Sequence, residues 1–276
     1  MKPSLREIEQ QVSQALDEDL GSGDLTAALV PQQEVSSATV IVRQSAVIAG
    51  VDWFNEVFRQ LDDGIAINWL VSDGEQVSAD TVLCTLKGNS RHLLTGERSA
   101  LNFLQTLSAV ATRTRQFVDA VSDYGTRILD TRKTIPGLRL AQKYAVTCGG
   151  GANHRIGLYD AILIKENHIE AAGSIANAMQ KALELVRDNT VIEIEVEDVN
   201  QMQQALDAGA RHMLLDNFSL KQLSEAVALN DGRARLEASG NVNLETIASI
   251  AATGVDDISV GELTKHINAI DLSMRF

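Results

Sequence analysis

The chain has 276 residues, 45% of them hydrophobic and 22% charged, which is typical of a globular protein with one large domain or two of unequal size. Its 24 lysines and arginines against 37 aspartates and glutamates give a net charge of −13, which argues against a nucleic-acid partner. No apolar run could span a bilayer, the charged start is not a signal peptide, and Cys84 and Cys148 lack metal-finger spacing, so we expect a cytoplasmic protein without a membrane partner.

The first part of the chain is predicted to hold helices and short strands. A capping box, Ser4 with Glu7 three residues later, predicts a helix that runs to about Asp19. The next segments are predicted as strands over 36–48, a short helix over 51–61, short strands over 65–86 and a long helix over 91–122. The long helix contains no proline, and we expect it to join two domains.

In the second part, short apolar runs alternate with helical patterns. Strands are expected over 127–130, 161–164, 191–196, 212–215, 236–238 and 257–260. Helices are expected over 138–146, 175–186, 200–208, 220–229 and 244–251. This alternation predicts a parallel sheet, either a barrel or a doubly wound sheet. Polar groups follow every run, and since the carboxyl ends of barrel strands form one face, a barrel with its site there is favoured over ordinary exposed strand ends.

One cationic segment stands out in this acidic chain, because residues 127–170 carry seven basic and four acidic residues. A local cationic site on an anionic protein favours a small, highly charged anion as ligand. The leading anion-binding candidates are Arg132, Lys133, Arg155 and Lys165. Solvated surface charge is the alternative. Lys165 follows an apolar run and Arg132 follows a strand, so we expect their stems to be buried.

Two histidines accompany these cations. His154 and His168 lack the spacing of an HExxH metal site, and we expect them to contact substrate, with a neutral structural histidine as the alternative. The run Gly149–Gly151 matches neither a P-loop nor a dinucleotide-binding pattern, and a tight turn explains it equally well.

Carboxylates and small residues end the later strands. Glu195 and Asp216 suit Mg²⁺, bound directly or through water or pyrophosphate, or the stabilisation of a sugar cation; exposed surface acids are the alternative. Two small-residue segments suit the phosphate site that barrels place after their last strands, and ordinary loops explain them as well: Ser239, Gly240 and Asn241, and Ser259, Val260 and Gly261.

Two rival functions fit less well. Residues 73–86 resemble the hammerhead strands of biotinyl or lipoyl carriers, but the turn at 78–80 has no lysine to modify. Lys165 at a strand end also resembles a Schiff-base lysine, which would leave the surrounding cationic cluster unexplained.

Several motifs together point to a known family. They are Thr131-Arg132-Lys133-Thr134 with Pro136-Gly137-Leu138-Arg139, Gly149-Gly150-Gly151 with Asn153-His154-Arg155, Leu163-Ile164-Lys165-Glu166-Asn167-His168, Glu97-Arg98 with Leu101-Asn102, and Glu237-Ala238-Ser239-Gly240-Asn241. Nearly the whole chain resembles quinolinate phosphoribosyltransferase, the decarboxylating nicotinate-nucleotide pyrophosphorylase family.

The resemblance implies an α/β fold with an N-terminal α/β sandwich domain, residues 1–110, joined by the tail 268–276. The C-terminal domain, residues 111–267, is implied to be an open (β/α) TIM-like barrel. A homodimer with shared active sites is also implied, in which Arg98 reaches into the neighbour's site, and further assembly of dimers is left open.

The implied reaction transfers phosphoribosyl from phosphoribosyl pyrophosphate to quinolinate with loss of CO₂, and uses Mg²⁺. Lys133, Lys165, Glu195 and Asp216 are the expected catalytic groups. The expected contacts to the dicarboxylate are Arg98, Arg132, His154, Arg155 and Lys165; those to phosphate are Lys133, His168 and the two small-residue segments, and Thr131 is a further substrate contact. A phosphoribosyltransferase for a monocarboxylate such as nicotinate, and a non-catalytic anion-binding paralogue, are the alternatives.

Overall fold

The chain packs as two compact units in the structure, a computed structural model that describes residues 2–186 and 190–276. The first unit contains the chain up to Arg115 together with Thr134–Gly150 and Leu263–Phe276, and the second contains Gln116–Lys133 and Gly151–Glu262. Each unit is therefore assembled from segments that are separate in sequence.

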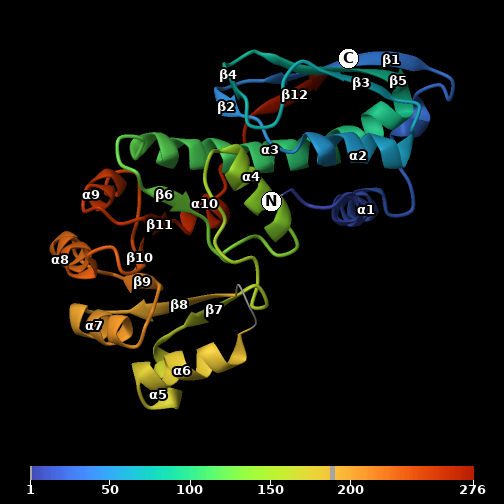
Figure 1. The fold of residues 1–276 in the computed structure, drawn as a ribbon. Helices are drawn as coiled ribbons and strands as arrows, with labels where there is room; N and C mark the ends of the chain where they lie inside the picture. The colour runs from blue at the N-terminus through green and yellow to red at the C-terminus, as the bar shows by residue number, and fades with distance from the viewer. Residues whose placement is uncertain (1, 187–189) are drawn as a thin grey trace. The chain divides into compact units, whose positions relative to one another are not determined.

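The first three helices begin within one residue of where the sequence predicts them. α1 (Leu5–Leu20) opens with the capping box, in which Ser4 Oγ accepts from Glu7 N and the Glu7 carboxylate accepts from Ser4 N. α2 (Val51–Leu61) turns an aromatic face inward, with Trp53 and Phe54 fully buried. α3 (Ser90–Ala120) is the long helix, and its residues run from the first unit into the second (Figure 1).

The main sheet of the first unit is antiparallel and buries one face. Its strands, in sheet order, are β12 (Leu272–Arg275), β1 (Val35–Val42), β5 (Val82–Asn89) and β3 (Ala66–Trp69); β2 (Ala46–Val47) and β4 (Gln76–Val77) form a separate pair. Along β1, Ala38, Val40 and Val42 are buried while Ser37 is exposed, because successive side chains of a strand point to opposite faces. Figure 1 shows α2 and α3 beneath this sheet.

Shorter elements are tied to the first unit by side-chain hydrogen bonds. The loop that precedes the 3-10 turn η1 (Ala27–Leu29) is held to α3, where Thr95 Oγ1 donates to Asp24 at 2.8 Å. Gln142 on α4 (Arg139–Cys148) is fully buried and donates to Thr264 O, in α10 (Glu262–Lys265), at 2.8 Å. The buried amide of Gln142 thus anchors α4 to the segment that leads to β12.

The second unit contains a six-stranded parallel sheet in the order β6-β11-β10-β9-β8-β7. Its strands are β6 (Arg127–Leu129), β7 (Ala161–Ile164), β8 (Val191–Val196), β9 (His212–Asp216), β10 (Arg235–Ser239) and β11 (Asp257–Ser259). Each strand from β7 to β11 pairs with its neighbour in sequence, and β11 pairs with β6, which is the cyclic order of a barrel. In the described residues β6 does not pair with β7; Ala152 bridges to Leu129 there, so the barrel is open.

Helices cover the outer side of this sheet, as Figure 1 shows. They are α5 (Glu166–Ala172), α6 (Ile175–Leu185), α7 (Val199–Asp207), α8 (Leu220–Asn230) and α9 (Ile247–Ala251). On β8, Ile194 and Val196 are fully buried, and Glu193 and Glu195 alternate with them. The two glutamates therefore face the interior of the barrel.

The predicted α/β fold is confirmed, and the cyclic strand order decides for an open barrel over a doubly wound sheet. Four short elements were not predicted, namely η1, α5, α10 and β12, and α9 begins three residues later than expected. Among the described residues, no helix combines the length and the apolar character that crossing a bilayer requires.

Candidate active site

A cavity of about 410 Å³ lies within the second unit, at the carboxyl ends of its parallel strands. Its lining residues are Thr131, Arg132, Lys133, His154, Arg155, Leu163, Lys165, Glu195, Leu214, Asp216, Glu237, Ser239 and Ser259. All except Leu163, Leu214 and Glu237 are residues that the sequence predicts as substrate contacts. The parallel strands bring them together because each carries its polar residue at the same end.

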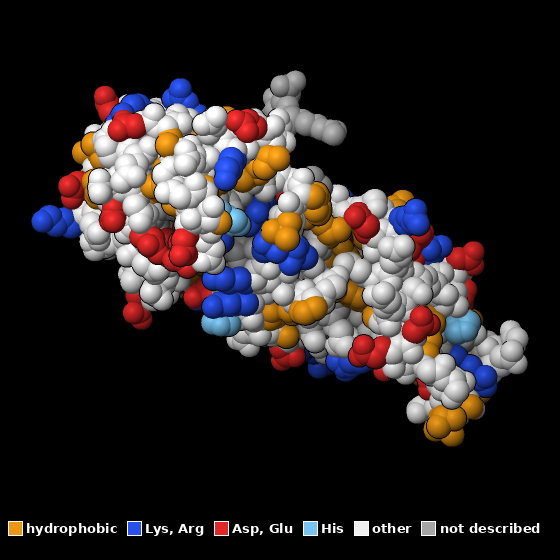
Figure 2. All heavy atoms as spheres, turned by 90° about the horizontal axis from the view of Figure 1, so that it is seen from below, with side chains coloured by type: hydrophobic (Ala, Val, Ile, Leu, Met, Phe, Trp, Pro, Cys, Tyr) orange, Lys and Arg blue, Asp and Glu red, His pale blue; other side chains and the backbone are white. Residues whose placement is uncertain are grey.

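Four cationic side chains line this cavity: Arg132, Lys133, Arg155 and Lys165. Burial, and then the neighbouring charge of Arg132, lower the pKa of the Arg155 guanidinium. An anion bound beside Arg155 would stabilise the charged form of its guanidinium. Figure 2 shows several Lys and Arg side chains close together on the face drawn there.

Cations and carboxylates meet across β7 and β8. Lys165 Nζ lies 3.0 Å from Glu195 Oε2, and the Lys165 side chain is 47% exposed while that of Glu195 is 16% exposed. Glu195 and Asp216 lie at the ends of the neighbouring strands β8 and β9. Arg132 follows β6, and Arg155 lies in the segment that leads to β7. The cavity is therefore bipolar, with cations next to the edge strands β6 and β7 and carboxylates at the ends of the inner strands β8 and β9.

A network of amides orients Asp216. Asn217 Nδ2 donates to Asp216 Oδ2 at 2.7 Å, and Asn217 N donates to Ser239 O at 2.9 Å. Gly240 packs so closely against this network that a Cβ at its position would lie 2.2 Å from Asn217 Oδ1. Asn241 Nδ2 donates to the same Oδ1 at 3.4 Å. The Ser239–Asn241 segment thus supports the Asp216 carboxylate through Asn217.

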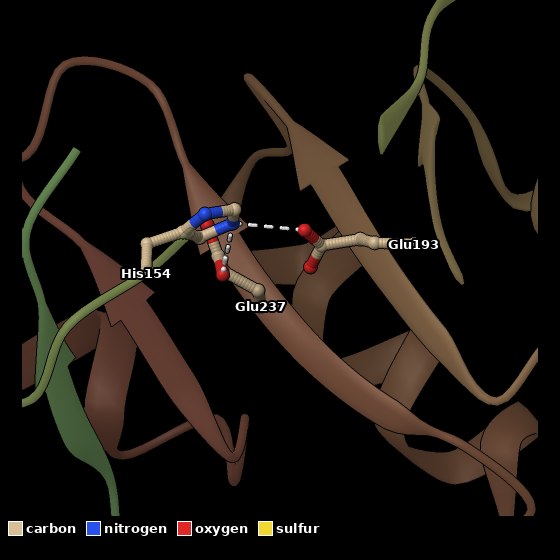
Figure 3. A group of neighbouring side chains, drawn as sticks. All are labelled: His154, Glu193 and Glu237. Atoms are coloured by element: carbon tan, nitrogen blue, oxygen red, sulfur yellow. Dashed lines mark hydrogen bonds and ion pairs between the residues drawn. The ribbon is translucent and has the colours of Figure 1, made fainter. Parts of the chain in front are cut away.

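His154 lies between two carboxylates, Glu193 on β8 and Glu237 on β10 (Figure 3). Its Nε2 is 2.8 Å from Glu193 Oε2 and 3.4 Å from Glu237 Oε2. Its Nδ1 accepts from Arg155 N at 2.7 Å, so the ring hydrogen is carried by Nε2. Both ring nitrogens therefore contact protein groups, and the ring bridges the Arg155 backbone to the floor of the barrel.

Glu237 is buried at the base of the cavity. Its residue is 3% exposed, and its Oε1 is buried without a hydrogen-bond partner in the part of the chain that the structure describes. Burial, and then the charge of Glu193, raise the pKa of Glu237 to about 8, and His154 and Ser259 only partly oppose this shift. Burial and the neighbouring carboxylate therefore favour the protonated form of Glu237 over its ion.

Six predicted site residues do not line the cavity: Arg98, His168, Gly240, Asn241, Val260 and Gly261. Arg98 is exposed on α3 in the first unit. His168 Nδ1 accepts from Lys165 N at 2.9 Å, so its ring caps α5. Val260 is 1% exposed, so its side chain is part of the core. Its backbone amide donates to Leu129 O and is therefore not directed at a phosphate.

Gly261 remains close to the cavity through Lys133. A Cβ at Gly261 would lie 3.2 Å from Lys133 Cδ, so the absence of a side chain there lets the lysine stem pass. The small residue after β11 thereby shapes the path of a cavity cation.

The sequence predictions missed Glu237, Glu193, Leu163 and Leu214 as parts of the site. The two glutamates each lie two residues before a predicted contact, Glu195 and Ser239, and so on the same face of their strands. This alternation was a signal for Glu193 and Glu237. The two leucines carried none, because an apolar floor residue is indistinguishable from core in a sequence.

The fold and the cavity define an open (β/α)-barrel protein whose site is built for polyanions. Residues 24–108 match the N-terminal domain of quinolinate phosphoribosyl transferase, and residues 110–275 match its C-terminal domain. The chain therefore belongs to the quinolinate phosphoribosyltransferase family.

Relatives and solved structures agree with this assignment. The chain is 41% identical to a probable nicotinate-nucleotide pyrophosphorylase [carboxylating] of Synechocystis over 97% of this chain and 92% of that protein. It is 36% identical to a mitochondrial quinolinate phosphoribosyltransferase [decarboxylating] of Nicotiana tabacum, over 98% and 82% respectively. The structure of the nicotinate-nucleotide pyrophosphorylase from Francisella tularensis shares 50% identity with a TM-score of 0.97, over 99% of this chain and 97% of that one.

Proposed function

We propose that this chain transfers phosphoribosyl from phosphoribosyl pyrophosphate to quinolinate, with loss of CO₂, to give nicotinate mononucleotide and pyrophosphate for NAD biosynthesis. The observation that carries the proposal is the bipolar cavity, in which four cations and the carboxylates Glu195 and Asp216 meet. Family membership and the names of full-length relatives support the same reaction.

The cations suit the two polyanionic substrates. Arg132, Arg155 and Lys165 would hold the two carboxylates of quinolinate, since a guanidinium binds a carboxylate bidentately. Lys133, whose stem passes Gly261, would bind phosphate together with Ser239 and Thr131. His154 would act by fixing the backbone of Arg155, because both of its nitrogens already contact protein groups.

The chemistry then follows from position and charge. The ring nitrogen of quinolinate attacks C1 of the ribose as pyrophosphate leaves, and positive charge develops on the sugar. Glu195 and Asp216 would stabilise this charge, and Lys133 and Lys165 would neutralise the anions around it. The ribosylated ring is cationic, so it accepts the electron pair released when the adjacent carboxylate leaves as CO₂.

Glu195 and Asp216 also fit Mg²⁺, because carboxylate oxygens are the hard ligands that this ion prefers. Both lie at the edge of the cavity, at the ends of adjacent strands. The ion would be held directly or through water or pyrophosphate, and when bound it would offset the charge of the leaving pyrophosphate.

We further propose a homodimer in which the exposed Arg98 of one subunit completes the site of the other. An exposed arginine on a helix is suited to reach a neighbouring chain's anion. The cytoplasm remains the expected compartment, which the unpaired Cys84 and Cys148 support, and small molecules are the expected partners in place of nucleic acid or membrane.

One assay tests the function. The purified protein, given quinolinate, phosphoribosyl pyrophosphate and Mg²⁺, is expected to release pyrophosphate and CO₂ in equal amounts. Release of pyrophosphate with nicotinate but not with quinolinate would indicate the monocarboxylate enzyme. Binding of quinolinate without any pyrophosphate release would indicate the non-catalytic anion-binding protein.

The site assignment has its own test. Lys133→Ala and Glu195→Ala are each expected to lower kcat roughly 100- to 1000-fold, the usual effect of removing one group that stabilises transition-state charge. Matched substitutions at exposed residues of α8, Lys221→Ala and Glu225→Ala, should leave kcat unchanged. Turnover near that of the unmodified protein in folded Lys133→Ala would show that the site is elsewhere.

A further inference from the structure

The proposed function leaves one proton without a source, and the inference rests on that function. When the carboxylate next to the ring nitrogen leaves as CO₂, its electron pair stays on the ring carbon C2. The product carries hydrogen at C2, so a proton must be delivered there. A positioned acid speeds such a transfer roughly 100- to 10,000-fold over unassisted solvent.

Few groups around the cavity are suited to this task. The guanidinium groups of Arg132 and Arg155 do not give up protons in proteins. Lys165 is engaged in an ion pair with Glu195, with 3.0 Å between Nζ and Oε2. Glu237 differs from these because it is a buried carboxyl that lines the same cavity between β9 and β11.

The groups that face Glu237 come from every neighbouring element. Glu193 on β8 approaches through the shared contact with His154, whose Nε2 lies 3.4 Å from Glu237 Oε2. Ser259 and Asp257 lie on β11, and the apolar Leu214 is the partner of Glu237 on β9. Two carboxylates and an apolar neighbour favour the protonated acid over the ion.

The surroundings of the two carboxyl oxygens favour a proton on Glu237. Glu237 Oε2 faces the N–H of His154, whereas Oε1 is buried without a hydrogen bond in the described structure. An ionised oxygen buried without a donor is costly, so a proton on the carboxyl relieves that cost. The raised pKa of about 8 agrees with the geometry.

We propose that Glu237 is the general acid that protonates C2 as CO₂ leaves, in the same step in which the C2–carboxylate bond breaks. The bond between C2 and the carboxylate breaks, and its electron pair, stabilised by the cationic ring nitrogen, takes the proton from the Glu237 carboxyl. The O–H electron pair stays on the carboxyl, which becomes a carboxylate. His154 Nε2–H stabilises that carboxylate, and solvent returns the proton once the products leave.

The decisive variant is Glu237→Gln, because glutamine keeps the shape and neutrality of a protonated glutamate but has no acidic proton. If Glu237 only fills space, the variant should behave like the unmodified enzyme. If it donates the proton, we expect the first turnover to release pyrophosphate at normal amplitude while CO₂ release slows roughly 100-fold or more. Quinolinate mononucleotide, which still carries both carboxylates, should then accumulate and be visible by mass spectrometry.

The control is Glu225→Gln, the same substitution at an exposed residue of α8. The burst of pyrophosphate itself reports a folded, substrate-binding site in the variant. Equal rates of CO₂ release in Glu237→Gln and the unmodified enzyme would overturn the role of Glu237 alone. Absence of pyrophosphate release from the unmodified enzyme would instead overturn the proposed function.

A second variant, Glu193→Gln, tests the acid role through the pH–rate profile, which would not change if Glu237 served packing alone. CO₂ release needs protonated Glu237, so it should fall as pH rises through about 8. The charge of Glu193 contributes to that raised pKa, and Glu193→Gln should therefore shift the basic limb of the pH–rate profile to lower pH. A basic limb that stays in place in Glu193→Gln would contradict the assignment.

Discussion

Gly240 shows how a single residue without a side chain controls a catalytic carboxylate. Its φ of +105° lies in the region that L side chains rarely adopt, and a Cβ there would meet Asn217 Oδ1 at 2.2 Å. Asn217 is the donor to Asp216, so a side chain at residue 240 would disturb the proposed site without touching a substrate.

We therefore expect Gly240→Ala to destabilise the protein by about 1–3 kcal/mol and to lower kcat by misplacing Asp216. Gly232→Ala is the matched control, because Gly232 also has a positive φ, +71°, but open space around it. The control should lose stability through the backbone alone and keep its kcat. Urea unfolding together with steady-state kinetics on both variants measures the two effects, and equal kcat values in the two would refute the link to Asp216.

The residues at the strand ends could be predicted one by one from the sequence. The hydrogen bonds that their side chains make to other strands could not. His154 was expected to contact substrate because it neighbours a cation, yet its Nε2 contacts Glu193 and Glu237 on two other strands of the barrel. Hydrogen bonds between residues 39 apart in sequence leave no local pattern. For Glu237, the alternation with Ser239 indicates the face of the strand, but only the packing of three strands shows how deeply the side chain is buried.

At the scale of elements, a buried aspartate at the start of β11 joins three strands of the barrel. Asp257 on β11 receives hydrogen bonds from Arg127 on β6 at 2.8 and 3.1 Å, and from Arg235 on β10. Its side chain is 4% exposed. Burial opposes ionisation of Asp257, but the hydrogen bonds from Arg235 and Arg127 outweigh it and lower its pKa.

Asp257→Asn is expected to lower the free energy of unfolding by about 3 kcal/mol at pH 7, because it leaves two arginines without their shared anion. A lowered pKa means that the carboxylate stabilises the fold above the ordinary pKa near 3.8, and that this stabilisation is lost as pH falls through the lower folded value. In Asp257→Asn, the free energy of unfolding should therefore fall less steeply than in the unmodified protein as the pH is lowered. Urea unfolding between pH 3 and 7 measures both effects, with the exposed Asp207→Asn on α7 as control. Unchanged stability at pH 7 would contradict this role.

Long, strongly patterned elements were predictable, and short ones were not. The repeating apolar runs located β7 and β8 to the residue, because a buried parallel strand reads as a continuous apolar or alternating segment. α5 was missed because its cap is made by His168, three residues inside the helix, in place of a Ser, Thr, Asp or Asn at the start. β12 has four residues and depends on β1 as a partner.

At the scale of the whole molecule, the shared-site proposal makes a quantitative prediction. Mixing an Arg98→Ala subunit with a Lys165→Ala subunit places all intact groups in one of the two sites of a mixed dimer. Random mixing of two inactive variants should therefore recover roughly a quarter of normal activity, since half of the dimers are mixed and each has one intact site.

The measurement is activity of the mixture after subunit exchange, with the mixed dimer verified by differently tagged subunits. A mixture of Arg98→Ala with Arg98→Ala carrying the second tag is the control, and it should stay inactive. Verified mixed dimers that recover nothing would show that Arg98 does not act on a neighbouring subunit.

The pairing of β12 with β1 also constrains the order in which the protein can be made. Arg43, just after β1, hydrogen-bonds Ser273, which lies 230 residues further along the chain. The ribosome synthesises β1 early and β12 only after every strand of the barrel. The first unit therefore stays incomplete while the second is synthesised. Until then β1 presents an open edge to other nascent chains. The unit whose synthesis starts first is thus completed last, and the edge of β1 stays unpaired until the final residues of the chain are made.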